Sequence, residues 1–443
     1  MSRNKKQVEI PSTIQTLGPA KIQSPLLDSG NYRGHPQFFQ EDDVRIPSDI
    51  LWSGGQPPKE PGPTFELAGP RSKIYFDSSK LKCAVVTCGG LCPGINSVVR
   101  SIVLELHHIY GVRNVVGVKF GFQGFIPRYG HDLMELLPET VADAHGRGGS
   151  FLGMSRGAQD IGEIVDALER LNIGLLFTIG GDGTLHAADL ITEEIQRRGL
   201  KTGVIGIPKT IDNDIAYVDQ TFGFSTAVEA AARVILSAHN ESTSAPYGLG
   251  LVKVMGRHSG FVAVNAVLAL KDVNICLIPE VNFDLEGDHG LLAAIRERVV
   301  DRGHGVVLVA EGAGQQYCAG DPAEHDASGN VKLGDIGIVL RERITEYFKK
   351  NGLELNLKYI DPSYEIRSQP ANATDRIYCG FLGQQAVHAG MAGKTGMVVS
   401  MLNNHYVHVP IKMAISHRKQ VNSLGALWRS VLESTGQPPL AAA

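Results

Sequence analysis

The sequence has no apolar run long enough to span a bilayer, and residues 1–30 lack the apolar core of a secretory signal. These residues also lack the Ser- and Arg-rich composition of a transit peptide. We therefore expect a cytoplasmic protein with no membrane partner. The formal net charge of −4 gives no general attraction to nucleic acid, so no nucleic-acid partner is expected either.

Several familiar chemical motifs are also missing. Gly89 and Gly90 are followed by Gly94 without the glycine spacing of a dinucleotide-binding Rossmann loop. Residues 393–395 read Gly-Lys-Thr, but His388 stands where a P-loop requires its first glycine. The cysteines lack zinc-binding spacing, so we expect reduced thiols. The six are Cys83, Cys88, Cys92, Cys276, Cys318 and Cys379.

The most informative segment present is a glycine-rich bend, GGDGT, at residues 180–184. The apolar run Leu175–Ile179 predicts a strand before it, and Leu185–Arg197 predicts an amphipathic helix after it. Glycine lets the backbone approach an oxyanion closely, and a helix start offers unpaired N–H groups. Asp182 would repel a phosphate there unless a magnesium ion held by Asp182 bridged the two. The alternative is a bend that only connects strand and helix.

A second polar segment, PKTIDNDI, follows the apolar run Gly203–Ile207. It therefore stands at the carboxyl end of a predicted strand, where open α/β sheets bind ligands. Asp212 and Asp214 share a face if the chain is extended, and one of them could accept a proton. A solvated acidic turn with Asn213 at a cap is the alternative. A further strand end, Cys83–Thr87 followed by a glycine bend, offers a nucleotide a second backbone wall.

Eight motifs stand in a specific order along the chain: TCGGLCPGIN at Thr87–Asn96, GGSFLGMSRG at Gly148–Gly157, GGDGT, PKTIDNDI, VMGRHSGF at Val254–Phe261, IPE at Ile278–Glu280, AEGAGQ at Ala310–Gln315 and YIDPSYEIRSQPANATDRIYC at Tyr359–Cys379. With them the chain resembles the phosphofructokinases over roughly residues 70–415, and most of all the plant-type ATP-dependent 6-phosphofructokinases. GGDGT alone would not be specific, because diacylglycerol kinases and NAD kinases have a similar bend. The resemblance implies an α/β fold with two Rossmann-like lobes, mostly parallel sheets and an N-terminal extension.

The resemblance also implies an activity, the transfer of a phosphoryl group from ATP to the 1-hydroxyl of fructose 6-phosphate in glycolysis. It makes Asp212 the base that takes the hydroxyl proton, Thr210 a contact to the transferred phosphate or sugar, and Asp182 the magnesium ligand. Positioning and charge neutralisation should supply the rest of catalysis.

Cationic residues within the matched motifs fit the charge of the moving phosphoryl group. Arg156 matches the family arginine that reaches the phosphates, Arg257 matches the one that steadies the transition state, and Lys209 precedes Thr210. Each of them, taken singly, would be interpreted as a surface salt bridge. The implied nucleotide contacts are Gly90, Arg156, Gly181, Asp182, Gly183 and Thr184.

The implied sugar-phosphate contacts come from several motifs. Glu311 would accept hydrogen bonds from sugar hydroxyls, and Tyr364 with Arg367 would face the 6-phosphate. The full implied set is Thr210, Asp212, Asp214, Met255, Gly256, Arg257, Glu311, Lys358, Tyr364 and Arg367.

Three positions depart from the bacterial pattern. Tyr364 stands where bacterial enzymes have histidine, Lys358 where they have arginine, and Gly248 where a neighbouring subunit would lend another arginine. These changes resemble the plant-type branch and leave the 6-phosphate contacts open. For Met255 and Tyr364 the alternative to a sugar-phosphate contact is an ordinary place in the hydrophobic core.

Two positions bear on the phosphoryl donor, and they disagree. In the family, aspartate in place of Gly183 together with lysine at 209 accompanies pyrophosphate, because the carboxylate intrudes on the α-phosphate space of a nucleotide. Gly183 leaves that space open, whereas Lys209 is the pyrophosphate-type residue. We weight the glycine more heavily, since steric exclusion and like-charge repulsion are hard to escape. ATP is the expected donor and pyrophosphate the alternative.

We predict an N-terminal arm over residues 1–80, a nucleotide-binding lobe over residues 81–224 and a sugar-phosphate-binding lobe over residues 225–365. The resemblance implies that residues 366–416 complete the first lobe and residues 417–443 the second. It further implies an allosteric enzyme that assembles as a homotetramer.

Two readings from other classes remain. A lipid or NAD kinase would share only the GGDGT bend and would not explain MGRHSG or the block Tyr359–Cys379. A non-catalytic regulatory subunit would be indicated by the loss of Asp212, Asp182 or Arg257, and all three are present.

Overall fold

The structure, a computed structural model, describes residues 10–28, 35–51, 55, 62–318 and 331–440. The chain forms two compact units and passes between them several times. Unit 1 comprises Met1–Lys209, Ile215–Gln220 and Arg376–His417, and unit 2 comprises Thr210–Asp214, Thr221–Asp375 and Arg418–Ala443. No helix in the described ranges is long and apolar enough to cross a bilayer.

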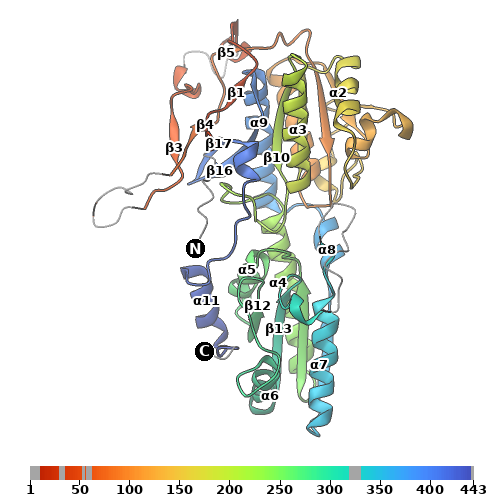
Figure 1. Ribbon diagram of the computed structural model, residues 1–443, viewed down its shortest axis with the longest axis vertical. Helices are drawn as coiled ribbons and strands as arrows, with labels where there is room; N and C mark the ends of the chain where they lie inside the picture. Colours follow the sequence, from red (N-terminus) through yellow and green to blue (C-terminus); the bar gives the residue numbers. More distant parts are fainter. Residues whose placement is uncertain (1–9, 29–34, 52–54, 56–61, 319–330, 441–443) are drawn as a thin grey trace, which may run out of the picture. The chain divides into compact units, whose positions relative to one another are not determined.

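Unit 1 is built on a nine-stranded sheet whose five central strands are parallel (Figure 1). Central strands such as β9 are buried at every residue, which explains their continuous apolar runs. In sheet order the strands are β3 (Arg45–Pro47), β4 (Thr64–Leu67), β17 (His405–Pro410), β16 (Met397–Leu402), β10 (Gly203–Pro208), β9 (Leu175–Gly180), β6 (Lys82–Thr87), β7 (Asn114–Val118) and β8 (Met134–Glu135).

The helices of unit 1 bury one apolar face each. In α2 (Ile161–Arg170), for example, Ile164, Val165 and Leu168 are buried, and the Asp160 side chain caps the helix by accepting from the Glu163 N–H at 2.8 Å. The others are α1 (Ile95–Leu104) with a π-helical turn at Glu105–Ile109, α3 (Asp182–Arg197), α9 (Ala373–Met391, from Arg376 onward) and α10 (Ile411–Ala414). Two short strand pairs are β1 (Gln15–Thr16) with β15 (Lys394–Thr395), and β2 (Ile22–Gln23) with β5 (Lys73–Ile74).

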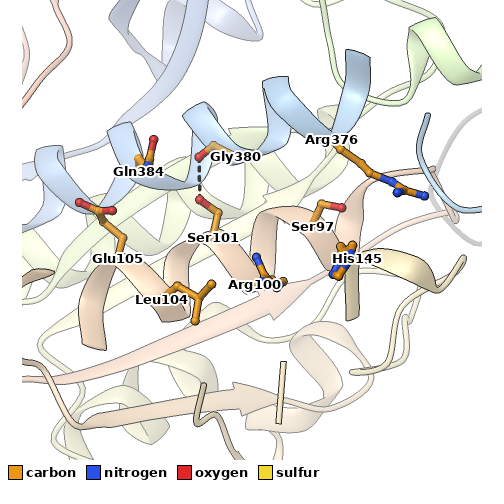
Figure 2. Close-up of a pocket in the computed structure, with 9 residues that line it drawn as sticks. All are labelled: Ser97, Arg100, Ser101, Leu104, Glu105, His145, Arg376, Gly380 and Gln384. Carbon is orange, nitrogen blue, oxygen red and sulfur yellow. Dashed lines mark hydrogen bonds between the residues drawn. The ribbon is translucent and has the colours of Figure 1, made fainter. Parts of the chain in front are cut away.

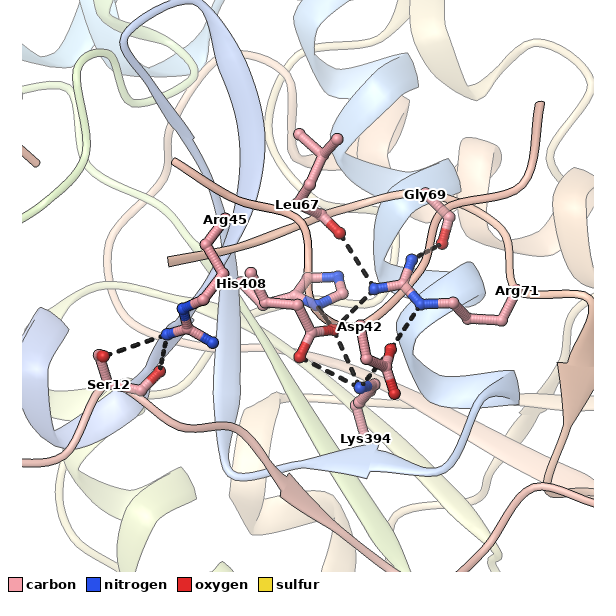
Figure 3. Close-up of polar contacts among 9 residues, drawn as sticks. Ser12, Asp42, Arg45, Leu67, Gly69, Arg71, Lys394 and His408 are labelled. Atoms are coloured by element: carbon pink, nitrogen blue, oxygen red, sulfur yellow. Dashed lines mark hydrogen bonds and ion pairs between the residues drawn. The ribbon is translucent and has the colours of Figure 1, made fainter. Parts of the chain in front are cut away.

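An ionic cluster around the buried Glu66 joins the N-terminal part of the chain to this sheet (Figure 3). Glu66 on β4 accepts from Arg71 at 2.7 Å, from Lys394 at 2.9 Å and from His408 of β17 at 3.0 Å. Asp42 completes it by pairing with Arg71 at 2.8 Å and Lys394 at 2.9 Å. β3 and β4, which lie in the predicted arm, are the last two strands at one side of the unit 1 sheet, with β3 at its edge.

Unit 2 is built on a four-stranded parallel sheet. Gly250 lets α4 pack closely, because a Cβ there would lie 3.0 Å from the Cβ of Ala238. The strands in sheet order are β12 (Ile275–Leu277), β13 (His304–Ala310), β11 (Gly248–Val254) and β14 (Asn356–Ile360). The helices are α4 (Phe224–Thr243), α5 (Phe261–Leu270), α6 (Leu291–Arg302), α7 (Ile336–Lys350), α8 (Ser363–Ser368) and α11 (Ala426–Thr435).

Two α/β units with mostly parallel sheets confirm the predicted fold class. The strands expected before the three polar loops are β6, β9 and β10, each within a residue of its predicted bounds. One boundary differs, because α3 begins at Asp182 and not at Leu185. An acidic residue is favourable in the first turn of a helix, where the backbone N–H groups are unpaired. Asp182 consequently belongs to the helix start itself.

The division of the chain also differs from the predicted lobes in detail. Residues 210–214 group with unit 2, because their contacts run to Ser259 and to the C-terminal segment that begins at Arg418. Residues 366–375 also group with unit 2, where Asp375 accepts from Thr226.

Candidate active site

In unit 1, three polar loops follow the adjacent strands β6, β9 and β10, so they meet at one edge of the sheet. Backbone hydrogen bonds connect them: the Cys88 N–H donates to the Ile179 carbonyl, and the Lys209 N–H donates to the Gly180 carbonyl, both at 2.9 Å. The Lys209 side chain is buried and donates to the Gly90 carbonyl at 2.7 Å. Lys209 therefore supports the Gly89–Gly90 bend from within.

The GGDGT bend leaves an open, exposed surface at the start of α3. Asp182 and Gly183 are exposed, and a Cβ built on Gly183 would have no atom within 4 Å. Thr184 is buried against Gly180, where a Cβ would lie 2.2 Å from the Thr184 Oγ1. Gly180 is thus required for packing, whereas Gly183 leaves free space on the side that faces solvent.

Asp182 offers one exposed carboxylate beside the unpaired N–H groups of a helix start. A single carboxylate is the protein donor set that magnesium uses when substrate phosphates supply further oxygens. Among the described residues, no group of three or more His, Cys, Asp or Glu side chains gathers as a metal site. Asp182 therefore fits an ion shared with a bound polyphosphate.

Arg156 belongs to the GGSFLGMSRG motif, which contacts the first glycine bend through the residue before Arg156. Its neighbour Ser155 accepts from the Gly89 N–H at 3.1 Å, which joins the motif to the first bend. The Arg156 side chain is exposed.

In unit 2, Asp212 stands at the centre of the second set of predicted residues. Its Oδ2 accepts weakly from the Arg257 N–H at 3.4 Å, and its carbonyl accepts from the Ser259 hydroxyl at 3.0 Å. Its Oδ1 is enclosed and has no hydrogen-bond partner among the described residues. Burial, with the neighbouring charges of Asp214 and Glu311, raises the pKa of Asp212 well above the usual range of a carboxyl group.

Asp214, although only two residues away, is in a different situation. It is buried, and its Oδ2 pairs with Arg418 at 2.8 Å. Its Oδ1 accepts from the Thr210 hydroxyl at 3.3 Å. Both oxygens of Asp214 therefore have partners within the protein.

The MGRHSG loop follows β11 and contains three of the predicted sugar-phosphate residues, Met255, Gly256 and Arg257. Gly256 has a φ of +128°, and a Cβ there would lie 2.6 Å from the Ser259 carbonyl, so only glycine fits without strain. Its carbonyl accepts from the Gly312 N–H at 3.0 Å, which places Glu311 beside Arg257. Arg257 also donates to the carbonyl of Val331.

The Glu311 carboxyl is half-buried among charged groups. Burial raises its pKa, and the positive charges of Arg257, Lys253 and Arg367 oppose that rise. Glu311 is therefore an acceptor surrounded by cations, as a group that binds hydroxyls beside a phosphate should be.

The remaining predicted sugar residues lie on β14 and α8. Arg367 stacks over the Tyr364 ring, with 5.0 Å between its guanidinium carbon and the ring centroid. Tyr364 is 83 % exposed, which rules out the core alternative for it, whereas Met255 is half-buried. Lys358 is exposed on β14.

Sequence reasoning missed a charge cluster beneath Glu311. The buried Lys253 pairs with Asp335 and Asp361, both at 2.9 Å, and Tyr359 donates to Asp335 at 3.3 Å. A lysine inside the apolar strand GLGLVKV was the available signal, because a buried lysine requires anionic partners. It also missed Arg418, which lies about two hundred residues from its partner Asp214 and in none of the eight motifs.

A separate cavity of about 310 Å³ lies in unit 1 between α1 and α9 (Figure 2). Ser101 donates to the Gly380 carbonyl across it at 2.6 Å, and burial raises the pKa of Glu105 to about 7. None of the predicted site residues lines it. Its lining residues are Ser97, Arg100, Ser101, Leu104, Glu105, His145, Arg376, Gly380 and Gln384.

The family profile named phosphofructokinase matches residues 82–390, which is more than half of the chain. The chain belongs to the phosphofructokinase family. It is 49 % identical over 431 residues to the ATP-dependent 6-phosphofructokinase of Borreliella burgdorferi, with 96 % of each chain covered. It is 45 % identical over 417 residues to ATP-dependent 6-phosphofructokinase 7 of Arabidopsis thaliana, with 94 % of this chain and 85 % of that one covered.

Solved structures of phosphofructokinases share the fold. The pyrophosphate-dependent phosphofructokinase of Marinobacter aquaeolei aligns with a TM-score of 0.65 at 19 % identity, over 82 % of this chain and 92 % of that chain. The phosphofructokinase of Saccharomyces cerevisiae aligns with a TM-score of 0.61 at 24 % identity, over 80 % of this chain and 50 % of that chain. At such identities the likeness concerns the fold alone.

Proposed function

We propose that this phosphofructokinase transfers the γ-phosphoryl group of ATP to the 1-hydroxyl of fructose 6-phosphate, giving fructose 1,6-bisphosphate. The observation that carries the proposal is the state of Asp212. Its carboxyl has an enclosed oxygen without a partner and a raised pKa, and Arg257 and Glu311 lie close by in unit 2. The relatives that align over nearly the whole chain carry the name of this activity.

In the proposed reaction, Asp212 takes the proton of the 1-hydroxyl as the hydroxyl oxygen attacks the γ-phosphorus. The bond between the γ-phosphorus and the β–γ bridging oxygen breaks, and ADP leaves with that oxygen. A base whose pKa is raised toward neutrality suits this proton transfer. Arg257 would stabilise the charge on the transferred group, and Thr210 would contact the phosphate or the sugar.

The exposed surface of unit 1 supplies the proposed nucleotide site. Gly90, Gly181, Gly183 and the start of α3 would hold phosphate oxygens through backbone N–H groups, and Arg156 would neutralise their charge. Thr184 and Lys209, both buried, would shape the bends. Asp182 would hold the magnesium ion, which when bound neutralises charge on the phosphate oxygens.

The open space at Gly183 supports ATP as the donor, because a nucleotide needs room for its α-phosphate there. Lys209 favours the second candidate, a pyrophosphate-dependent enzyme. Its ammonium group binds the Gly90 carbonyl and supports a bend, a role compatible with either donor.

On the acceptor side, Glu311 would accept from the sugar hydroxyls, and Arg367 would bind the 6-phosphate. Tyr364 would contact the same phosphate, since its exposed ring is held by Arg367. Lys358 lies exposed on β14 and would lend long-range positive charge. Met255 and Gly256 would form the wall beside Arg257.

We further propose that the enzyme is cytoplasmic, assembles as a homotetramer and is allosterically regulated, as the family resemblance implies. Size-exclusion chromatography with light scattering tests the assembly. A mass of four chains is expected, and a monomer would contradict it.

The activity is tested with purified protein, fructose 6-phosphate and magnesium, with either ATP or pyrophosphate. We expect fructose 1,6-bisphosphate with ATP. Turnover only with pyrophosphate would overturn the weight given to Gly183, and no turnover with either donor would favour a non-catalytic subunit.

A further inference from the structure

The segment that begins at Arg418 runs along the acceptor loops of unit 2. It touches both the loop that carries Asp212 and the MGRHSG loop. Its hydrogen bonds are from the Lys419 N–H to the Asp214 carbonyl at 2.8 Å, from Gln420 Nε2 to the His258 carbonyl at 3.2 Å, and from the Val421 N–H to Glu280 Oε1 at 2.8 Å. The C-terminal part of the chain therefore helps to form the acceptor site.

A short series of contacts leads from Arg418 to Asp212. Arg418 Nη1 pairs with Asp214 Oδ2 at 2.8 Å, and Asp214 Oδ1 accepts from the Thr210 hydroxyl at 3.3 Å. The Thr210 oxygen accepts from the Asp212 N–H at 3.1 Å. Through two side chains, Arg418 thus fixes the turn from which the Asp212 carboxyl projects.

The charges in this series act on Asp212 as well. Besides burial, the carboxyls of Asp214 and Glu311 raise its pKa, while the Arg257 N–H and the charge of Arg418 lower it. Two neighbouring carboxylates cannot both ionise easily unless a cation compensates one of them. A base must be ionised to take the hydroxyl proton, so the compensation of Asp214 matters for Asp212.

We propose that Arg418 is a positioning residue for phosphoryl transfer, because its ion pair with Asp214 both shapes the turn of Asp212 and compensates the neighbouring negative charge. The inference rests on the proposed function. It assigns Asp214 to the support of the base and gives the C-terminal segment a part in catalysis.

The test measures the pH dependence of kcat at saturating substrates for R418Q, D214N and R418K. R418Q removes a charge that lowers the pKa of Asp212. The acid limb of its kcat–pH profile, where kcat falls as the base becomes protonated, should therefore move to higher pH by about 0.5–1 unit. D214N removes a charge that raises this pKa, so its acid limb should move to lower pH. R418K keeps the charge and should stay near wild type. Because every variant meets the same substrates, a displacement between variants belongs to the protein.

R429Q is the matched control, since Arg429 forms an exposed pair with Glu433 on α11 of the same C-terminal segment. It should leave the limb unchanged. Thermal unfolding checks that the variants are folded, and if R418Q does not fold, R418M, which also removes the charge but keeps an apolar stem, takes its place. Opposite displacements support the proposal, whereas unmoved limbs or displacements in the same direction overturn it. An inactive wild-type enzyme would instead overturn the proposed function and, with it, the role of Asp212.

Discussion

Two carboxyl groups, that of the buried Glu66 in unit 1 and that of the half-buried Asp212 in unit 2, have opposite surroundings. Burial alone would raise the pKa of Glu66, but the hydrogen bond from His408 and the charge of Lys394 lower it to about 2. Burial lowers the pKa of His408 itself, which favours its neutral imidazole. His408 therefore acts on Glu66 through its hydrogen bond and not through a positive charge. For Asp212, burial and the negative charges of Asp214 and Glu311 all disfavour the ionised carboxylate, so its pKa is raised.

The difference distinguishes a carboxyl group that stabilises the fold from the one that we propose as the catalytic base. Glu66 is surrounded by partners that satisfy its charge, so it links β4 to β17 and to Lys394. Asp212 keeps an oxygen without a partner among the described residues, which costs stability unless a ligand uses it. The balance of neighbouring charges accounts for the opposite directions of the two pKa shifts, since burial acts on both in the same direction.

The largest expected effect comes from Asp212→Asn. We expect kcat to fall by about 10²–10⁴-fold or more with KM near wild type, because a base is lost and binding groups remain. Thermal stability should be equal to that of wild type or higher, since the substitution removes a carboxylate that Asp214 and Glu311 repel. Steady-state kinetics and calorimetry measure both, with D301N on the exposed end of α6 as control. A variant with nearly full kcat would remove Asp212 from its role.

Glu66→Gln should show the reverse behaviour. It leaves Arg71 and Lys394 buried with less negative charge, and removing one partner of a buried pair costs about 3–5 kcal/mol. The unfolding midpoint in urea should fall, while kcat of the folded enzyme changes little. E433Q, at an exposed pair, is the control and should cost less than about 1 kcal/mol. A large loss of kcat without loss of stability would contradict the structural assignment.

The same contrast has a pH signature. Because the pKa of Glu66 is lowered in the folded state, its contribution to stability is present above the ordinary glutamate pKa. It is lost as the pH falls from there toward about 2. Unfolding by urea at a series of acidic pH values should show a slope in wild type that is smaller in E66Q. Equal slopes would contradict the shift.

Gly183→Asp tests the donor surface of unit 1. The added carboxylate would face the phosphates, so kcat/KM for ATP should fall by about 10–100-fold. Gly183→Ala is the matched control, because a Cβ meets no atom within 4 Å and alanine favours a helix. It should remain within a few-fold of wild type. If the two variants were equally impaired, the space at Gly183 would not discriminate between donors.

Lys253→Met should have the smallest effect. Loss of the ammonium leaves Asp335 and Asp361 uncompensated near Glu311, so KM for fructose 6-phosphate should rise by about three- to tenfold. The kcat value should change less, and K253R should restore part of the affinity. An unchanged KM would show that this cluster supports only the fold.

Much of the fold was predictable because its signals are local. Apolar runs such as Leu175–Ile179 and Gly203–Ile207 can be buried only in central parallel strands, and glycine follows where the chain must turn sharply. The start of α3 was placed three residues late, because Gly183 argued against helix while the favourable acidic first turn was not weighed. The strands β3 and β4 are short, and β17, which pairs with β4, lies more than three hundred residues away in the sequence.

The candidate site was predictable where its chemistry is carried by contiguous motifs, as for Asp182, Asp212 and Arg257. The supporting charges were not, because ion pairs such as that of Asp214 and Arg418 join residues far apart in sequence. Motif matching also gave Asp214 and Lys209 ligand-facing roles. In the structure their side chains contact Arg418 and the Gly90 carbonyl, which no motif indicated, and their ligand-facing roles stay predictions.

The most direct test of the central claim is a crystal structure with fructose 6-phosphate and a non-hydrolysable ATP analogue. We predict a carboxylate oxygen of Asp212 within hydrogen-bond reach of the sugar's 1-hydroxyl, about 2.6–3.2 Å. We also predict Asp182 on the metal side of the terminal phosphate. An Asp212 carboxylate that points away from the 1-hydroxyl in that complex would contradict the account.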